Sequence, residues 1–256
     1  NLSDNQITEE EMIYKLNKIN ETKTKKKIKE FRPNFQNDLI YPNPSDIEYI
    51  EDDGKVKRMI KIKYSDDKND FGNHGVEILS SAEGLNRLQV LSLAGNKLTD
   101  RAAATLANSK NLINLKRLFV QINSLGPKGV NALAQSELMN SLEFLYLKRN
   151  PLGLDGAKAL ASSVAFENVK ELYLGRTQLG NDGLAALCGG KIWPNLTALS
   201  LAQNSLDDQS AHLLADTESF PKLITLDLYG NQISDEAVDV IKGSPQRKCL
   251  RALQVN

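Results

Sequence analysis

The sequence predicts an α/β solenoid, in which strand–helix units of equal length stack side by side. Two columns of residues lead to this prediction, and both recur every 27 residues. The first is a polar column in which all members but one are asparagine: Asn69, Asn96, Asn123, Asn150, Thr177, Asn204 and Asn231. The second is a pair of apolar positions shortly before it: Leu91/Leu93, Leu118/Val120, Leu145/Leu147, Leu172/Leu174, Leu199/Leu201, Leu226/Leu228 and Leu253/Val255. Such constant spacing is typical of a repeat array, whose units each pack only on their neighbours.

Residues 1–46 precede the repeats and are polar and charged. Thr8 and Glu11 form a capping-box pattern ahead of apolar residues at helical spacing, which predicts a helix from about 8 to 22. The lysine-rich run 23–29 could bind phosphate or act as a localisation signal, whereas solvated lysines at a helix end are the simpler interpretation. Prolines then indicate an irregular connector.

Residues 47–84 are expected to form a hairpin and a degenerate first repeat that caps the array. Asp53-Gly54 is a favoured two-residue hairpin turn, and it lies between the apolar segments Ile47–Glu51 and Val56–Tyr64. The helical half keeps the repeat frame from Asn69 to Leu79, although charged residues occupy core columns of the second strand. Terminal repeats are atypical in this way because one of their faces meets water.

Residues 85–256 contain the regular units and a final strand. In each unit the two leucines point inward, because alternate side chains of a strand face opposite sides. The residue between them therefore faces outward: Ser92, Phe119, Tyr146, Tyr173, Ser200 and Asp227. The final strand has no helix after it, so we expect its parallel edge to be covered by further chain or by another molecule.

The second half of each unit is predicted to be a helix, because its apolar positions lie three residues apart, as in Ala103 and Leu106. The residue before the first of them is small, as in Gly129 and Gly156, which would let the helix approach the sheet closely. Helix starts are marked by Thr99-Asp100, Asp207-Asp208, Ser234-Asp235 and Pro127. Because packed helices need about 10 Å and strands about 4.8 Å, the stack is expected to curve into a horseshoe with strands on its concave face.

The segment Leu142–Leu152 has the pattern L-x-x-L-x-L-x-x-N-x-L. It resembles the leucine-rich repeat, and the long strand–helix unit is similar to the ribonuclease-inhibitor class of that family. The resemblance covers 85–256 and, less closely, 59–84. It departs from the inhibitor itself, which is rich in cysteine and alternates two repeat lengths. The short regular array with a Lys/Asn-rich N-terminus is also similar to effector proteins that intracellular bacteria deliver into the host cytosol.

Composition argues against several classes of protein. Lysine plus arginine and aspartate plus glutamate each total 32, so no net field draws the chain to nucleic acid or to a membrane. The cysteines, Cys188 and Cys249, lack metal or redox spacing, which suits a reducing compartment and predicts a cytoplasmic protein. No apolar run approaches the roughly 20 residues that span a bilayer. The sequence does not begin with methionine, and we expect it to be a fragment or a processed form.

The candidates for chemistry all have simpler structural interpretations. The asparagines are expected to satisfy backbone groups inside the turns. Trp193 occupies a column of apolar residues and Cys188 a column of alanines, so both are predicted to be core residues. His74 and His212 fall on exposed helical columns, without a partner at a motif spacing. We therefore predict no catalytic residue, no metal site and no cofactor, and hence no enzyme.

The outward face of the strands has no comparable structural explanation. Phe119, Tyr146 and Tyr173 stand on adjacent strands about 5 Å apart. Large rings with cations around them are typical of a protein-binding surface, and cross-strand stacking that only stabilises the sheet is the alternative interpretation. The predicted protein-binding residues are Arg117, Phe119, Phe144, Tyr146, Lys148, Arg149, Glu171, Tyr173, Arg176, Asp227 and Tyr229.

These observations favour a monomeric scaffold that binds another protein through its concave face. The resemblance to the ribonuclease-inhibitor class implies one mode of action, in which the scaffold occludes the active site of a partner enzyme. Two alternatives stay open from the sequence. One is a regulator that activates a partner enzyme, as GTPase-activating members of the class do. The other is the substrate-recruiting arm of a larger ligase.

Overall fold

A computed structural model describes residues 49–52, 55–61, 72–81 and 85–255 of the chain. The predicted helix from 8 to 22 and the lysine-rich run 23–29 lie outside the described residues. So do the Asp53-Gly54 turn and the asparagine at position 69.

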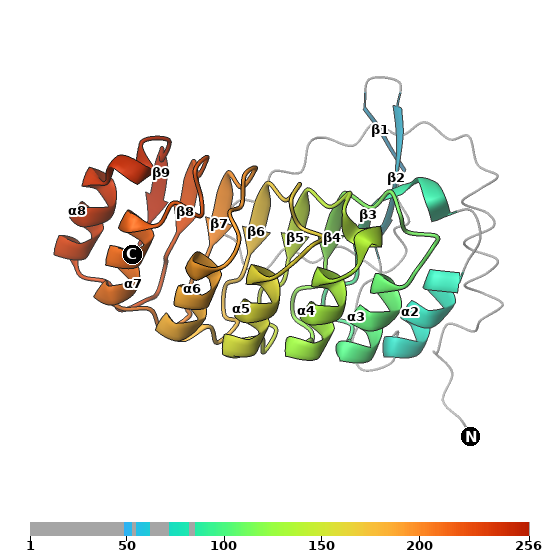
Figure 1. The fold of residues 1–256 in the computed structure, drawn as a ribbon. Helices are drawn as coiled ribbons and strands as arrows, with labels where there is room; N and C mark the ends of the chain where they lie inside the picture. The colour runs from blue at the N-terminus through green and yellow to red at the C-terminus, as the bar shows by residue number, and fades with distance from the viewer. Residues whose placement is uncertain (1–48, 53–54, 62–71, 82–84, 256) are drawn as a thin grey trace.

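The described strands form one sheet in which the strands follow their order in the sequence (Figure 1). The strands are β1 (Tyr49–Asp52), β2 (Lys55–Lys61), β3 (Leu88–Ser92), β4 (Arg117–Phe119), β5 (Phe144–Tyr146), β6 (Glu171–Tyr173), β7 (Ala198–Ser200), β8 (Thr225–Asp227) and β9 (Ala252–Gln254). β1 and β2 pair antiparallel, which confirms the predicted hairpin pairing, and every later pair is parallel. From β3 to β9 the register joins residues that are 27 positions apart, such as Leu118 and Leu145.

The helices form a second layer along one side of this sheet (Figure 1). They are α2 (Gly72–Ser81), α3 (Asp100–Ala107), α4 (Pro127–Ala134), α5 (Gly153–Ala161), α6 (Gly180–Gly189), α7 (Asp208–Asp216) and α8 (Asp235–Gly243). Single turns of 3-10 helix occur at η1 (Leu85–Arg87), η2 (Glu137–Met139) and η3 (Pro245–Arg247). The strands line the concave face and the helices the convex face, so the predicted α/β solenoid is confirmed.

The core lies between the two layers and consists of the inward leucine columns and the apolar helix face. Leu118, Leu145 and Leu172 are fully buried, and the helix residues equivalent to Ala103 and Leu106 are all buried as well. Trp193 is 0% exposed and packs in the column that also holds Phe166 and Phe220, which confirms its predicted core position. Cys188 is buried, also as predicted, and Cys249 is exposed.

The asparagine column is a hydrogen-bonded ladder that joins successive turns. The Oδ1 atom of Asn123 accepts from the backbone N–H groups of Asn96 at 2.8 Å and Leu98 at 3.0 Å. Its Nδ2 atom donates to the carbonyls of Leu93 at 3.0 Å and Val120 at 2.9 Å. One side chain thus satisfies backbone groups in its own turn and in the preceding one, which confirms the structural interpretation of the column.

Thr177 interrupts this ladder, and the main chain takes over part of the lost role. The Thr177 hydroxyl has two acceptors for its single hydrogen, the Leu174 carbonyl of its own turn at 2.6 Å and Oδ1 of Asn204, the next asparagine of the column, at 3.2 Å. The N–H of Leu152 then binds the main-chain carbonyl of Thr177 at 3.1 Å, where the equivalent Leu125 uses an asparagine side chain. The shorter side chain therefore changes the turn geometry and does not leave this N–H unsatisfied.

The small residues before the helical core positions lie close to the preceding helix or to the turn that leads into their own helix. That they bring the helix close to the sheet stays a prediction. A Cβ atom added at Gly129 would lie 2.6 Å from Oδ1 of Asp100 and 3.0 Å from Cβ of Ala103, both on α3. At Gly156 and Gly183 the added atom would lie 2.7 Å and 3.1 Å from Cβ of Leu152 and Leu179, in the turn before each helix. These close approaches leave little room for larger side chains in this column.

The helix starts follow the predicted capping residues with one exception. The Asp207 carboxylate accepts from the N–H of Gln209, Ser234 accepts from that of Ala237, and Pro127 occupies the first turn of α4. Thr99 makes no capping bond to its own helix. Instead, its side chain faces Asn73 of the preceding helix.

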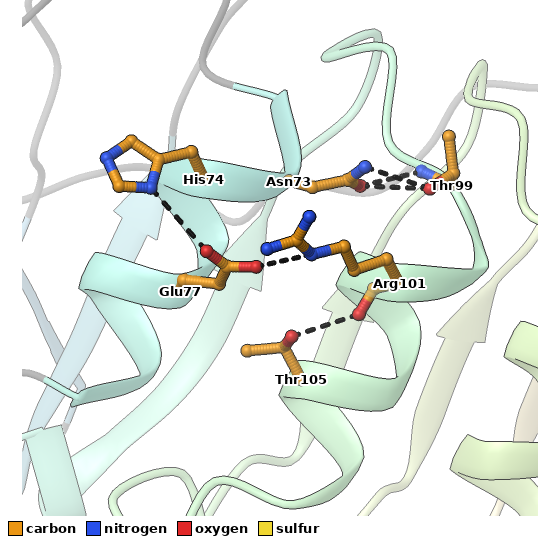
Figure 2. Close-up of polar contacts among 6 residues, drawn as sticks. All are labelled: Asn73, His74, Glu77, Thr99, Arg101 and Thr105. Carbon is orange, nitrogen blue, oxygen red and sulfur yellow. Dashed lines mark hydrogen bonds and ion pairs between the residues drawn. The ribbon is translucent and has the colours of Figure 1, made fainter.

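Polar contacts join α2 to α3 (Figure 2). The Asn73 Nδ2 atom donates to Oγ1 of Thr99 at 2.9 Å, and the Thr99 N–H donates back to Oδ1 of Asn73 at 3.0 Å. Arg101 and Glu77 form an ion pair with 2.6 Å between Nε and Oε1. The first described helix therefore attaches to the array one repeat before α3. The division of the chain at residues 46 and 84 stays a prediction.

Candidate protein-binding surface

Three aromatic rings form a continuous stack on the concave face of strands β4, β5 and β6. The ring centroids of Phe119 and Tyr146 are 4.3 Å apart with an interplanar angle of 25°. Those of Tyr146 and Tyr173 are 4.1 Å apart with an angle of 9°. The parallel register pairs these residues directly, so the shared repeat position produces the stack. We call Phe119, Tyr146 and Tyr173 the aromatic stack.

Glu171 holds two of these rings through their hydroxyl groups. The Tyr173 hydroxyl donates to Oε2 of Glu171 at 2.8 Å, and the Tyr146 hydroxyl donates to the same oxygen at 3.3 Å. Burial raises the pKa of both hydroxyls, and the negative charge of Glu171 raises each of them further. Both tyrosines therefore stay protonated at neutral pH and remain hydrogen-bond donors to this carboxylate.

Arg117 and Phe144 form a cation–π pair beside the aromatic stack. The guanidinium carbon of Arg117 lies 4.2 Å from the centroid of the Phe144 ring. These residues are direct neighbours on β4 and β5, at the position two residues before the stack. The pair presents a cation and an apolar ring together, a combination that is frequent at protein interfaces.

Lys148, Arg149 and Arg176 lie in the turns that follow β5 and β6. The φ angles of Arg149 and Arg176 are 57° and 56°, so both have left-handed backbone conformations. Arg176 is exposed, and its Nε donates to the side-chain oxygen of Gln203. The stem of Lys148 runs beside β6, since a Cβ atom at Gly175 would lie 3.5 Å from its Cγ. The structure thus brings these cations to one edge of the aromatic stack.

The expectation that the whole outward row faces solvent was wrong for three residues, of which Ser200 is 6% exposed. Tyr173 is 9% exposed, because it is packed within the stack and its hydroxyl is bound by Glu171. Asp227 is 8% exposed, since its carboxylate accepts from the Ser200 hydroxyl at 2.7 Å and from the N–H of Tyr229 at 3.0 Å. Tyr229 itself is 47% exposed.

The sequence analysis missed an ion-pair cluster along the starts of the strands. Glu143 lies 2.9 Å from Nζ of Lys116 and 2.8 Å from Nζ of Lys170. These three residues occupy one column in successive repeats, so the alternation of charge at 27-residue steps was a usable signal. Burial opposes ionisation of Glu143, but the two lysines outweigh it and hold the pKa of this carboxyl below its usual value.

This pKa shift predicts a pH dependence of stability. A carboxyl whose pKa is lower in the folded state stabilises the fold at pH values above its unfolded pKa, and the contribution is lost as the pH falls through the folded pKa. We therefore expect Glu143→Gln to make urea unfolding less sensitive to pH below the ordinary value of 4.5 than in the wild type. The exposed Glu137→Gln is the matched control. Equal pH profiles for wild type and Glu143→Gln would contradict the prediction.

His74 and His212 lie on exposed helical positions, as predicted. His74 contacts Glu77, with 3.5 Å between Nδ1 and Oε2. Within the described ranges, no group of three or more His, Cys, Asp or Glu side chains is placed to hold a metal ion. Nor is any helix in these ranges long and apolar enough to cross a bilayer.

Part of the chain matches a known family of repeats. The family model described as "Leucine Rich repeat" matches residues 86–107, 139–161, 167–188 and 221–242. Each match contains a strand and all or nearly all of the helix that follows it. The chain folds as a leucine-rich-repeat solenoid. No enzymatic family is indicated.

Solved structures similar to this chain include an internalin from Listeria monocytogenes, with 20% identity and a TM-score of 0.44 over 70% of this chain. The complex of Rad7 and Elc1 in yeast is also similar, with 19% identity and a TM-score of 0.41 over 71% of this chain. The aligned region spans 50% and 44% of the length of those chains. Comparison with curated protein sequences gives no match.

Proposed function

We propose that this leucine-rich-repeat array binds another protein through its concave face, centred on the aromatic stack and the Arg117–Phe144 pair. The observation that carries the proposal is the position of the rings. The hydrophobic core is built from the leucines on the opposite face of the sheet, and none of these rings belongs to it as described. Large rings on the outer face, next to arginine, have the composition of a binding hot spot.

The alternative is that the rings only stabilise the sheet. Cross-strand aromatic pairs contribute roughly 0.2–1 kcal/mol each, which is small beside the buried leucine columns. Stacking does not account for the guanidinium over Phe144 at the next position. The rings also occur in three adjacent repeats only, whereas Ser92 and Ser200 occupy the same position in the flanking repeats. These two observations favour a local binding surface.

The proposed mode of action is steric, in which the rigid array covers the active site of a partner enzyme. This mode comes from the resemblance to the ribonuclease-inhibitor class. We also propose that the protein acts as a monomer in the cytosol, in line with the free thiols of Cys188 and Cys249. The similarity to bacterial effectors extends the proposal to the cytosol of a host cell.

The partner can be identified by crosslinking affinity capture of the full chain followed by mass spectrometry. If the partner is an enzyme, its turnover is measured with and without the array. Lowered turnover supports the proposed occlusion, whereas raised turnover would replace it with activation. Unchanged turnover together with ubiquitin-type modification of the bound protein would indicate substrate recruitment.

The variant Tyr146→Ser tests the binding surface. Serine occupies this position in Ser92 and Ser200, so the backbone accepts it. We expect Tyr146→Ser to weaken binding of the captured partner by about 2 kcal/mol or more in calorimetric titration, because the central ring of the hot spot is removed. Combining it with Tyr173→Ser should weaken binding further.

The control variant is Tyr146→Phe, which keeps the stacked ring and removes only the hydroxyl bound to Glu171. It should retain most of the affinity. Circular dichroism of each variant establishes that the fold is intact. Unchanged affinity in the folded double variant would eliminate the concave face as the binding surface.

A further inference from the structure

The turns that follow strands β3, β5 and β6 carry a cluster of positive charge at the edge of the aromatic stack. We call this cluster the cationic rim, and its members are Lys97, Lys148, Arg149 and Arg176. The turn segment 94–97 and its equivalents up to 229–232 contain no aspartate or glutamate. The chain as a whole has a net charge of +0, so the rim does not follow from overall composition.

Two members of the rim occupy a backbone position that favours glycine. Arg149 and Arg176 have φ angles of 57° and 56°. The equivalent residues in the first and last of these turns are Gly95 and Gly230, with φ angles of 69° and 68°. A side chain with left-handed backbone costs free energy that glycine avoids. Ile122 and Gln203 share this conformation in the other two turns, with φ angles of 58° and 54°, so the left-handed backbone belongs to the repeat and does not itself select arginine. The fold therefore gives no reason for the positive charge in two adjacent repeats.

These arginines have no acidic partner within the part of the chain that the structure describes. The described ion pairs include neither guanidinium, and the Nε–H of Arg149 is buried without a hydrogen-bond partner there. The carboxylates of the neighbouring strands are already engaged. Glu171 accepts from two tyrosine hydroxyls, and Asp227 accepts from a serine hydroxyl.

We infer that the partner segment that docks beside the aromatic stack is an acidic stretch of polypeptide, whose carboxylates pair with Arg149 and Arg176. This inference rests on the proposed function. Adjacent repeats are about 4.8 Å apart along the sheet, and each guanidinium can hold a carboxylate through two parallel hydrogen bonds. A segment with closely spaced aspartates or glutamates can therefore engage both arginines while its apolar side chains contact the ring edges.

The same cations would attract a nucleic acid, but the geometry of the rings favours a polypeptide. Single-stranded nucleic acids gain affinity by stacking bases on open aromatic faces. Tyr146 has Phe119 at 4.3 Å and Tyr173 at 4.1 Å as stacked neighbours, so both of its faces are covered. Side chains of a polypeptide, which pack against ring edges, suit this arrangement better.

The test uses the full chain and labelled synthetic peptides of equal length that share aromatic and leucine residues and differ in charge. One peptide is acidic, one neutral and one rich in lysine, and oligothymidine is added as a nucleic-acid probe. Fluorescence anisotropy should show the acidic peptide binding about tenfold or more tightly than the lysine-rich one at low salt. This preference should shrink as the salt concentration rises, because ions screen exposed charges.

The double variant Arg149→Gly/Arg176→Gly should lose the preference for the acidic peptide, while its melting temperature stays the same or rises. Glycine removes the charge and also relieves the left-handed backbone. The matched control is Ile122→Gly, at the same turn position with a φ angle of 58° and no charge. This control should keep the preference for the acidic peptide.

Equal binding of the charged peptides, or tighter binding of oligothymidine than of the acidic peptide, would overturn the inference. Its failure can be separated from failure of the proposed function with the captured partner. A partner whose affinity depends on Tyr146 but not on the two arginines would refute the acidic segment alone. A partner whose affinity is independent of Tyr146 would refute the concave binding surface itself.

Discussion

Replacing Trp193 with alanine is expected to lower the free energy of unfolding by about 3–5 kcal/mol, the range for large buried aromatic residues. The side chain is fully buried between the two layers, in a column whose neighbouring members are Phe166 and Phe220. The substitution leaves a large cavity. The surrounding repeats cannot move to fill it, because each repeat is also packed against its other neighbour. Urea unfolding followed by far-ultraviolet circular dichroism measures the change.

Trp193→Phe is the matched variant. Phenylalanine already occupies the same column in the adjacent repeats, and the indole Nε1–H has no hydrogen-bond partner within the described structure. Most of the stability should therefore be retained, with a loss of about 1 kcal/mol for the reduced volume. If Trp193→Ala lowered the free energy of unfolding by less than about 1 kcal/mol, the indole ring would not be filling the core.

Asn204→Ala is the second substitution with a large expected effect, a loss of about 3 kcal/mol or more. The Asn204 amide accepts from the N–H groups of Thr177 at 2.9 Å and Leu179 at 3.3 Å. It donates to the carbonyls of Leu174 at 2.7 Å and Leu201 at 3.0 Å. Each of these buried groups would lose a partner, and a buried group without a partner costs about 1–3 kcal/mol.

Two further variants, one in the asparagine column and one outside it, provide controls and are measured by the same urea titration. Thr177→Ala, in the same column, removes the hydroxyl's bonds to the Leu174 carbonyl and the Asn204 side chain and should cost about 1 kcal/mol. Asn168→Ala removes an exposed amide bound to the carbonyl of Asn140 and should cost less. If Asn204→Ala proved no more costly than Asn168→Ala, the ladder would not be a principal source of stability.

The pattern of rings and charge extends what the repeat fold alone implies about binding. The fold explains a rigid concave sheet, and any protein of the fold would present one. The aromatic stack, the Arg117–Phe144 pair and the cationic rim are properties of this chain, and they cluster on β4 to β6 and the adjoining turns. Specificity for a partner is therefore expected to reside in those repeats.

The sequence by itself determined the solenoid and the register of its strands. A constant step of 27 residues adds one strand per repeat, so residues at equal positions must become neighbours along the sheet. This is why the adjacency of Phe119, Tyr146 and Tyr173 could be predicted before any coordinates, as could the hydrogen-bonding role of Asn123 and the buried position of Trp193. Repetition converts spacing along the chain directly into contact in space.

Only the tertiary structure decided which of these side chains are covered and how they interact. The burial of Tyr173, the two tyrosine hydroxyls on Glu171 and the Ser200–Asp227 bond depend on rotamers and on small rotations between adjacent strands. The spacing of residues contains no information on either. The same holds for the glycine column, whose close contacts are with the preceding helix at Gly129 and with the turn residue Leu152 at Gly156, because such contacts depend on the packing of whole layers.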